Sequence, residues 1–346
     1  MTSKDRVTRH LLTPRPYPAK LSLVIPIYDE ELAFPRLRAE IERFKGELHC
    51  ATEIVLVNDG SSDGTLDDLV EWAAADSSVK VLHLSRNFGH QIAATAGLDY
   101  ATGDAVVLMD ADLQDPLEVI HPMIDRYCEG YDVVYGERES RAGESVFKRF
   151  TAWAFYRIMR ALVYDRLTVD AGDFRLISQA CLTGLREMRE VHRFLRGMVA
   201  WAGYPQIGIK YRRQPRSAGS TKYPVRKMLS FAWTAATSFS TVPLRVSTIL
   251  GILTGVFALE EAVRALIEHS LGATVPGWTS LMIVTAAIGS AMLTSLGVVG
   301  EYVAKLYEQS KGRPMYFVAR TFNVGADKDT APEQKAAASA ARTRLQ

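Results

Sequence analysis

Cysteine is scarce in this chain, and its spacing excludes a disulfide framework and a cysteine-rich zinc site. The three cysteines, Cys50, Cys128 and Cys181, lie far apart and form no CxxC pair. We interpret them as reduced thiols in a cytosolic compartment. None of the seven histidines pairs with another at zinc-ligand spacing. His90 lies beside a candidate site, although core or capping roles are commoner for a single histidine.

The chain also lacks a strong charge imbalance and an apolar segment at its start. Its 41 basic and 39 acidic residues give a formal net charge of +2, which argues against a general nucleic-acid binder. The first twenty residues carry several Lys and Arg but no apolar run. We therefore expect no signal peptide and a cytoplasmic N-terminus.

What the chain does have is a sharp change in composition. Apolar runs and charges alternate up to about residue 225, and the sequence becomes mostly apolar from Met228. We predict an N-terminal extension (1–20), a cytoplasmic catalytic domain (21–227), juxtamembrane and transmembrane helices (228–305) and a cytoplasmic tail (306–346). The tail after about Asn323 carries no readable chemistry.

Strand and helix signals alternate through the first 115 residues, which predicts an α/β fold with a parallel sheet. The expected strands are 21–27, 53–57, 79–84 and 104–109. The expected helices are 30–45, a helix capped by Ser62 or Asp63, and 90–102. Ligands of such sheets bind at the carboxyl ends of the strands. Three of these four ends carry carboxylates, and the other carries Arg86.

Two of these carboxylates, Asp110 and Asp112, stand two residues apart after a buried strand. Mg²⁺ and Mn²⁺ prefer such oxygen ligands and complete their shells with substrate phosphates. The alternative is a solvated loop whose aspartates cap the next helix. The two aspartates alone therefore do not establish a metal site for a diphosphate, and the motifs around them must decide.

That context is a set of motifs in a fixed order. The chain carries Pro26-Ile27-Tyr28-Asp29-Glu30, Asn58-Asp59-Gly60-Ser61, Ser85-Arg86-Asn87-Phe88-Gly89-His90 and Asp110-Ala111-Asp112-Leu113-Gln114-Asp115-Pro116. These resemble family 2 glycosyltransferases of the GT-A fold, and among them the bactoprenol-phosphate glucosyltransferases and dolichol-phosphate mannose synthases. The resemblance covers about residues 20–323. It implies a Rossmann-like GT-A domain followed by a two-helix transmembrane hairpin.

The resemblance also implies roles for individual residues. Nucleotide-sugar contacts fall on Pro26, Tyr28, Glu30, Asp59, Arg86, Asp110, Ala111, Gln114, Arg138, Arg216 and Lys222. The metal would lie at Asp110 and Asp112, with Asp112 the more direct, catalytic ligand. The family usually has Asn where this chain has Asp29. Because both residues can cap the following helix, we expect little consequence.

Asp173, in Ala171-Gly172-Asp173-Phe174-Arg175, matches the segment that carries the family's proposed catalytic carboxylate. From spacing alone, a turn aspartate is the better interpretation. The second pKa of a phosphate monoester is about 6, so the acceptor is already ionised at neutral pH. A strong base is therefore not required, and Asp173 could instead orient the acceptor, the sugar or the metal.

The acceptor phosphate needs cationic partners. Arg193 and Arg196 are three residues apart on a helix predicted at 191–201, so we expect them to share a face. Lys148 and Arg149 are further candidates. Arg216 and Lys222 lie in a Gly- and Ser-containing basic loop. The alternatives are a solvated basic face and attraction to anionic lipid headgroups.

Residues 278–300 carry no charge and are long enough to cross a bilayer core of about 30 Å. The uncharged stretch 246–259 is too short alone and must extend through Glu260 and Arg264, which can pair at i,i+4. A re-entrant or interfacial helix is the alternative. Because Lys and Arg are missing from 265–304, we expect a hairpin with both ends cytoplasmic. A helix at 146–163 could lie in the membrane interface or dock on the sheet.

Together these features predict a metal-dependent glycosyltransferase of the inner membrane. It would move a sugar, with inversion, from a nucleoside-diphosphate sugar, UDP-glucose before others, to an undecaprenyl-type polyprenyl phosphate for cell-envelope glycosylation. The rivals are a GDP-mannose-dependent polyprenyl-phosphate mannose synthase, a processive synthase, whose QxxRW motif we do not find, and a non-catalytic membrane scaffold. Family resemblance also implies a homo-oligomer, a tetramer in some relatives, and we expect no nucleic-acid partner.

Overall fold

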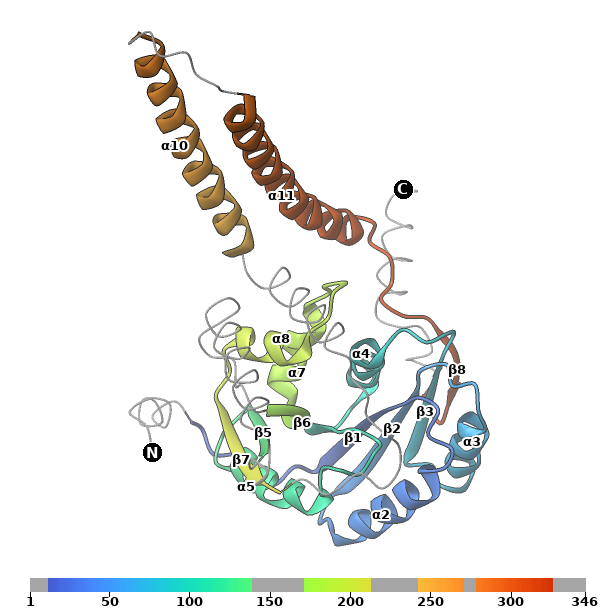
Figure 1. Ribbon diagram of the computed structural model, residues 1–346. Coiled ribbons are helices and arrows are strands. Elements are labelled where there is room, and N and C mark those ends of the chain that lie inside the picture. The colour runs from blue at the N-terminus through green and yellow to red at the C-terminus, as the bar shows by residue number, and fades with distance from the viewer. Residues whose placement is uncertain (1–11, 139–170, 213–241, 271–277, 326–346) are drawn as a thin grey trace, which may run out of the picture. The chain divides into compact units, whose positions relative to one another are not determined.

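The computed structural model describes residues 12–138, 171–212, 242–270 and 278–325. The chain forms two compact units. The first unit holds the sheet and also takes in the residues from Arg313 onward, whereas the second holds the two long apolar helices. Figure 1 shows the elements of both units.

The first unit is built on one mixed sheet of eight strands in the order β7-β5-β6-β4-β1-β2-β3-β8. The strands are β1 (Lys20–Ile27), β2 (Ala51–Asn58), β3 (Val79–Leu84), β4 (Ala105–Leu108), β5 (Val133–Arg138), β6 (Ala171–Ser178), β7 (Gln206–Tyr211) and β8 (Val318–Phe322). β4, β1, β2 and β3 run parallel, which confirms the predicted α/β core. β6 is antiparallel to both β4 and β5, and β8 is antiparallel to β3.

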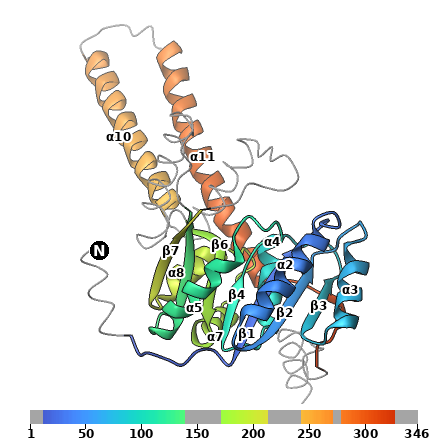
Figure 2. The same ribbon diagram turned by 90° about the horizontal axis from the view of Figure 1, so that it is seen from below.

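Helices cover both faces of this sheet (Figure 2). They are α2 (Phe34–Glu47), α3 (Thr65–Ala75), α4 (His90–Tyr100), the 3₁₀ turn η1 (Leu117–Val119), α5 (Ile120–Cys128), α7 (Gln179–Glu187) and α8 (Leu195–Ala202). Alternate residues of β1 face opposite sides, as a pleated strand requires. Leu23 and Ile25 join the core under α2 and α3, whereas Val24 meets α4 so closely that Gly97 has no room for a Cβ atom.

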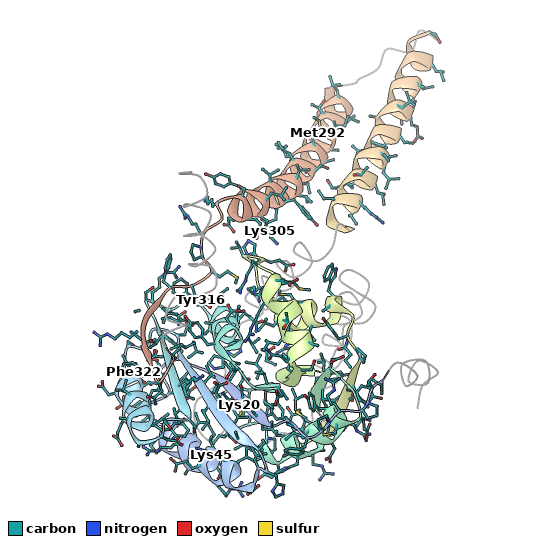
Figure 3. All side chains as sticks on the ribbon, turned by 180° about the vertical axis from the view of Figure 1, so that it is seen from behind. Lys20, Lys45, Met292, Lys305, Tyr316 and Phe322 are labelled. Atoms are coloured by element: carbon teal, nitrogen blue, oxygen red, sulfur yellow. The ribbon has the colours of Figure 1, made fainter. Side chains whose placement is uncertain are left out.

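The segment after the last long helix returns to the sheet, which the predicted tail from 306 onward did not anticipate. β8 pairs with β3, and Asn323 donates to carbonyls at the end of α3 and the start of β3. The hydroxyl of the buried Tyr316 donates to Asp99 on α4 at 2.8 Å. Figure 3 labels Tyr316 and Phe322 along this segment. Residues 313–323 are therefore part of the first unit.

The second unit contains α10 (Val242–Ser270, 29 residues) and α11 (Trp278–Ser310, 33 residues). The two helices lie side by side, and the Ser295 hydroxyl donates to the carbonyl of Ser247 at 3.4 Å. Their apolar side chains are largely exposed. Met292 on α11, labelled in Figure 3, has 68% of its surface exposed. Within the described residues, one stretch is long and apolar enough to cross a membrane, Ala287–Ser310. This stretch runs ten residues past the predicted end at 300, since α11 continues to Ser310.

A buried ion cluster fixes the amino end of the sheet. Glu53, which is 2% exposed, accepts hydrogen bonds from Ser22 and Thr102 and pairs with Lys20 and Lys80. Burial alone would raise the pKa of Glu53, but the hydrogen bonds from Lys80, Ser22 and Thr102 outweigh it and lower that pKa to about 2. The cluster therefore ties β1, β2, β3 and the start of β4 together.

We expect Glu53→Gln to lower the free energy of unfolding by about 3 kcal/mol at pH 7 because the charged form is favoured in the folded state. The folded pKa lies below the unfolded one, so this contribution is present above about pH 4.5 and is lost toward pH 2. Unfolding in detergent at pH 7 and at pH 3.5 should show the gap to wild type narrowing by about 1 kcal/mol or more. Glu71→Gln, on an exposed face, is the control. If the difference in free energy of unfolding between wild type and Glu53→Gln is the same at both pH values, the lowered pKa of Glu53 is contradicted.

The loop after β4 contains a strained residue. Leu113 has φ of +51°, in the left-handed region that leucine rarely adopts. This backbone turn allows the Gln114 N–H to donate to the Asp112 carboxylate at 3.1 Å. The strain therefore lies inside the predicted metal-binding motif.

A matched pair of variants measures this strain. Leu113→Ala and Leu113→Gly both remove the packing of the side chain, but only glycine removes the φ penalty. We expect the Gly variant to be more stable than the Ala variant by about 0.5–1 kcal/mol, the reverse of the usual order. Thermal unfolding of the two proteins checks this. An Ala variant at least as stable as the Gly variant would show that the backbone is relaxed.

Candidate active site

The predicted polar residues do meet at one edge of the sheet. Parallel pairing places Ile27 opposite Asn58 and Val24 opposite Leu108, so β1, β2 and β4 end side by side. The loops that follow these three strands begin at Tyr28, Asp59 and Met109. The carboxyl edge of the sheet is therefore the candidate active site.

Contacts between the loops that follow β2 and β3 hold one part of this edge. The buried Asp59 carboxylate accepts from the backbone N–H groups of Phe88 (2.7 Å) and Gly89 (2.9 Å). Burial raises the pKa of Asp59 even though these two bonds oppose the shift. Gly60 lies so close to Arg86 that a Cβ atom would stand 2.5 Å from its carbonyl carbon. The predicted ribose-binding residue Asp59 thus also fixes the loop that carries Arg86.

The residues predicted to contact the nucleotide on and after β1 and after β3 lie at this edge of the sheet. Pro26 is in β1 beyond its pairing with β4, so its missing N–H breaks no hydrogen bond of that pairing. The Tyr28 side chain is about half exposed, and the Arg86 guanidinium stacks on Phe88 at 4.0 Å from the ring centre. The Glu30 backbone N–H donates to Thr65. These positions suit contacts with a base and ribose at an open edge.

Asp29 does not cap the helix that follows it. We had expected little consequence from Asp at this position, where the family usually has Asn, because both residues can cap a helix, and that reason was wrong. Its φ is +49°, and its carboxylate accepts from the Ser62 N–H at 2.7 Å. Helix α2 begins instead after Ala33, without a side-chain cap. Asp29 links the loops after β1 and β2, and Asn also tolerates this left-handed backbone.

The acidic centre lies between β4 and β6. The His90 Nε2 atom stands 3.4 Å from Asp110 Oδ1 and 3.5 Å from Asp173 Oδ2. Burial, together with the charges of Asp173 and Asp112, raises the pKa of Asp110. Burial would lower the pKa of His90, but Asp173 and Asp110 outweigh it and raise that pKa. A cation is thus favoured between the two carboxylates.

Asp173 is buried, and both of its oxygens are engaged. Arg196 Nε donates to Oδ1 at 2.7 Å, and Gln91 Nε2 donates to Oδ2 at 3.2 Å. Burial would raise the pKa of Asp173, but His90, Arg196 and the buried Arg175 outweigh it and hold that pKa far below its usual range. The side chain is therefore a firmly held anion and a weak base.

The Asp110-Ala111-Asp112 loop offers hard oxygen donors to a metal. Ala111 and Gln114 are buried, and the Asp112 carboxylate is fixed by the Gln114 N–H. Among the described residues, no group of three or more His, Cys, Asp or Glu side chains is arranged to hold an ion by itself. One or two carboxylates completed by phosphate oxygens is the donor set that Mg²⁺ or Mn²⁺ takes at nucleotide sites. The residues fit such an ion once a diphosphate supplies the remaining ligands.

The acceptor side differs from the prediction. Helix α8 begins at Leu195, so Arg193 precedes it and does not share a helix face with Arg196. Arg193 instead donates to the Thr95 hydroxyl at 3.2 Å and to the carbonyl of Met188. The hydrogen bond that the Leu195 N–H donates to Gln91 marks the true helix start. Of this predicted pair, Arg196 is the one that reaches Asp173.

Several predicted residues cannot be placed in the site. Lys148, Arg149, Arg216 and Lys222 lie outside the described residues, as does the helix expected at 146–163. Arg138 ends β5, which places its backbone next to Tyr211 of β7. Their roles stay predictions.

Two site residues were missed by sequence reasoning. Gln91 and Arg175 stand within two positions of quoted motif residues, but neither had been given a role. Arg175 is buried and donates to the carbonyls of Gly172 and Asp173. The available signal was that Gln91 follows His90 and that Arg175 lies two residues after Asp173. Such nearness in the sequence does not reveal contacts with distant segments.

Comparison with known proteins identifies the family of this chain. The family model described as glycosyl transferase family 2 matches residues 22–184. An uncharacterized glycosyltransferase of Synechocystis is 42% identical over 87% of this chain and 95% of its own length. A prophage bactoprenol glucosyl transferase homolog of Escherichia coli is 35% identical over 87% of this chain and 99% of its own.

A solved mannosyltransferase of Pyrobaculum calidifontis, in complex with GDP-Man and Mn²⁺, covers 84% of this chain and 92% of its own. Its TM-score is 0.41 and its identity 16%. The mixed GT-A sheet, the polar residues at its carboxyl edge and relatives that match nearly the whole chain lead to one conclusion: the chain belongs to glycosyl transferase family 2.

Proposed function

We propose that this glycosyltransferase moves glucose from UDP-glucose to a polyprenyl phosphate, with inversion, at the cytoplasmic face of a membrane. One observation carries the proposal: a single chain joins an acidic edge of a GT-A sheet to a pair of long apolar helices. A water-soluble donor and a lipid acceptor require both parts. Relatives named bactoprenol glucosyl transferase match 86–87% of the chain, so the likeness extends into the apolar helices.

In this proposal the lipid phosphate attacks the anomeric carbon from the side opposite the nucleoside diphosphate. The new carbon–oxygen bond forms as the bond to the diphosphate breaks. A phosphate monoester has its second pKa near about 6, so no proton has to be removed at neutral pH. The low pKa of Asp173 agrees with a role in holding Arg196 and His90. Arg196 is then the acceptor-phosphate residue that the described site supports best.

Asp110 and Asp112 would hold Mg²⁺ or Mn²⁺ on the donor diphosphate. The metal would neutralise charge on the leaving group. Asp59 and Arg86 keep the nucleotide loop in place, since Asp59 fixes Phe88 and Gly89. The homo-oligomer implied by family resemblance stays a prediction.

The membrane proposal rests on chain connectivity. The first unit contains both β7, before the long helices, and β8, after them, and β8 pairs with β3. Any membrane crossings between Tyr211 and Val318 would therefore be even in number. If α11 crosses, we propose α10, among the described helices, for the return crossing, since its continuous helix through Glu260 favours a span over a re-entrant turn. We propose a multi-pass protein of the inner membrane with its active site in the cytoplasm.

The donor and metal can be tested together. Purified protein is incubated with undecaprenyl phosphate, Mn²⁺ or Mg²⁺, and radiolabelled UDP-glucose, other UDP-sugars or GDP-mannose, and label in the organic phase is counted. We expect label from UDP-glucose, its loss with EDTA, and a fall of about 100-fold or more in Asp112→Asn. Asp67→Asn, at an exposed position of α3, is the matched control. Label from GDP-mannose alone would favour a mannose synthase, and label from no donor would favour a scaffold.

Topology has its own test. We expect Ser270→Cys, at the end of α10, to react with a membrane-impermeant maleimide added to intact spheroplasts, and Ser310→Cys, at the end of α11, to react only after lysis. The parent protein controls for the three native cysteines. Protection of Ser270→Cys until lysis would contradict a span by α10.

A further inference from the structure

Gln91, the second residue of α4, bridges two groups that lie far from it in the sequence. Its Nε2 atom donates to Asp173 Oδ2 at 3.2 Å, and its Oε1 atom accepts from the backbone N–H of Leu195 at 3.0 Å. Asp173 belongs to β6, and Leu195 is the first residue of α8. One side chain therefore joins α4, β6 and α8, three elements of the first unit whose ribbons Figure 1 labels.

Arg196, which follows Leu195, closes a ring. Its Nε atom donates to the other oxygen of Asp173, Oδ1, at 2.7 Å. The ring runs from Asp173 through Gln91 to the start of α8 and back through Arg196. Because Phe194 provides no side-chain cap, the Gln91 oxygen also satisfies an N–H at the start of α8.

Glutamine is the side chain that this ring needs. A carboxylate such as Asp173 only accepts hydrogen bonds, and a backbone N–H only donates. Position 91 must therefore present a donor to one partner and an acceptor to the other, at about the length of glutamine. Glutamate would face a carboxylate with a second acceptor, and a basic side chain would face an N–H with a second donor.

The ring lies next to the proposed chemistry. His90 precedes Gln91 and spans Asp110 and Asp173 at 3.4 and 3.5 Å. A shift of Asp173 or Arg196 would thus move the acceptor side relative to the donor side. Asp59, which fixes the nucleotide loop, makes contacts outside the ring.

We propose that Gln91 is a positioning residue of the transfer reaction: it holds Asp173 and Arg196 where the lipid phosphate binds. This inference rests on the proposed function for its catalytic consequence. It predicts that a change at position 91 affects the acceptor and leaves the donor nearly untouched.

The test is an exchange of groups within the ring. In Gln91→Glu two acceptors face each other, and in Asp173→Asn the anion is lost. In the double variant the new amide N–H at position 173 can donate to the new carboxylate at position 91. That carboxylate can still accept from Leu195, and the amide oxygen at position 173 can accept from Arg196. The double variant thus restores the three hydrogen bonds of the ring and keeps the net charge, although it replaces the Asp173 oxygen that faces His90 with an amide N–H group. Gln179→Glu, at the exposed start of α7, is the matched control.

We expect Gln91→Glu to lower kcat/KM for the lipid phosphate by about 10- to 100-fold, with the KM for UDP-glucose within about 2-fold of wild type. The double variant should recover at least about 5-fold over Gln91→Glu. Unchanged acceptor kinetics in Gln91→Glu would overturn the proposal. So would a double variant whose loss equals the product of the single losses.

Thermal unfolding of wild type, the two single variants and the double variant separates this inference from the function. The Tm of the double variant should be higher than the value expected if the Tm changes of the two single variants simply added. This holds whether or not any sugar is transferred. Additive Tm shifts would overturn the ring. If the wild-type protein transfers no sugar but the Tm shifts of the variants are coupled, the proposed function is refuted. The hydrogen-bonded ring would then stand without a role in transfer.

Discussion

Electrostatic repulsion at the carboxyl edge of the sheet is the constraint on which the site depends. Asp110, Asp112 and Asp173 bring three carboxylates to this edge. Arg196, His90 and the buried Arg175 offset the charge of Asp173, whereas the pKa of Asp110 stays raised. The protein thus neutralises one of these carboxylates itself. In the proposed function, Asp110 and Asp112 are left for a cation bound to the donor diphosphate, and Asp173 lies on the acceptor side.

The two apolar helices interrupt the part of the chain that forms the sheet. The chain leaves the sheet after β7 and returns to it as β8, so the apolar helices are an insertion in one folded domain. Tyr316 extends this return to α4, where Asp99 accepts from both Tyr316 and Arg189. The first residues of α4 are His90 and Gln91. A single buried helix therefore connects the segment that follows α11 with the acidic centre.

The sequence predicted what local patterns encode. Buried runs located the four parallel strands within a few residues, and motifs located Asp110, Asp112 and Asp173. Patterns failed where a partner lies far along the chain. Leu195 is 104 residues from Gln91, and its hydrogen bond sets the start of α8, so Arg193 was wrongly placed on that helix. β8 is short and partly exposed, and it pairs with β3, a strand far away in the sequence. No local signal predicted it.

In the proposed function Asp173 is a held anion, and the acceptor phosphate brings its own ionised oxygen. The pH dependence of kcat/KM for the lipid phosphate should be compared with that for a phosphonate acceptor, which binds its second proton more tightly. We expect the acid limb to move upward with the phosphonate and to keep its position in Asp173→Asn. An acid limb that stays in place when the acceptor is changed, and that disappears in Asp173→Asn, would instead identify Asp173 as the base.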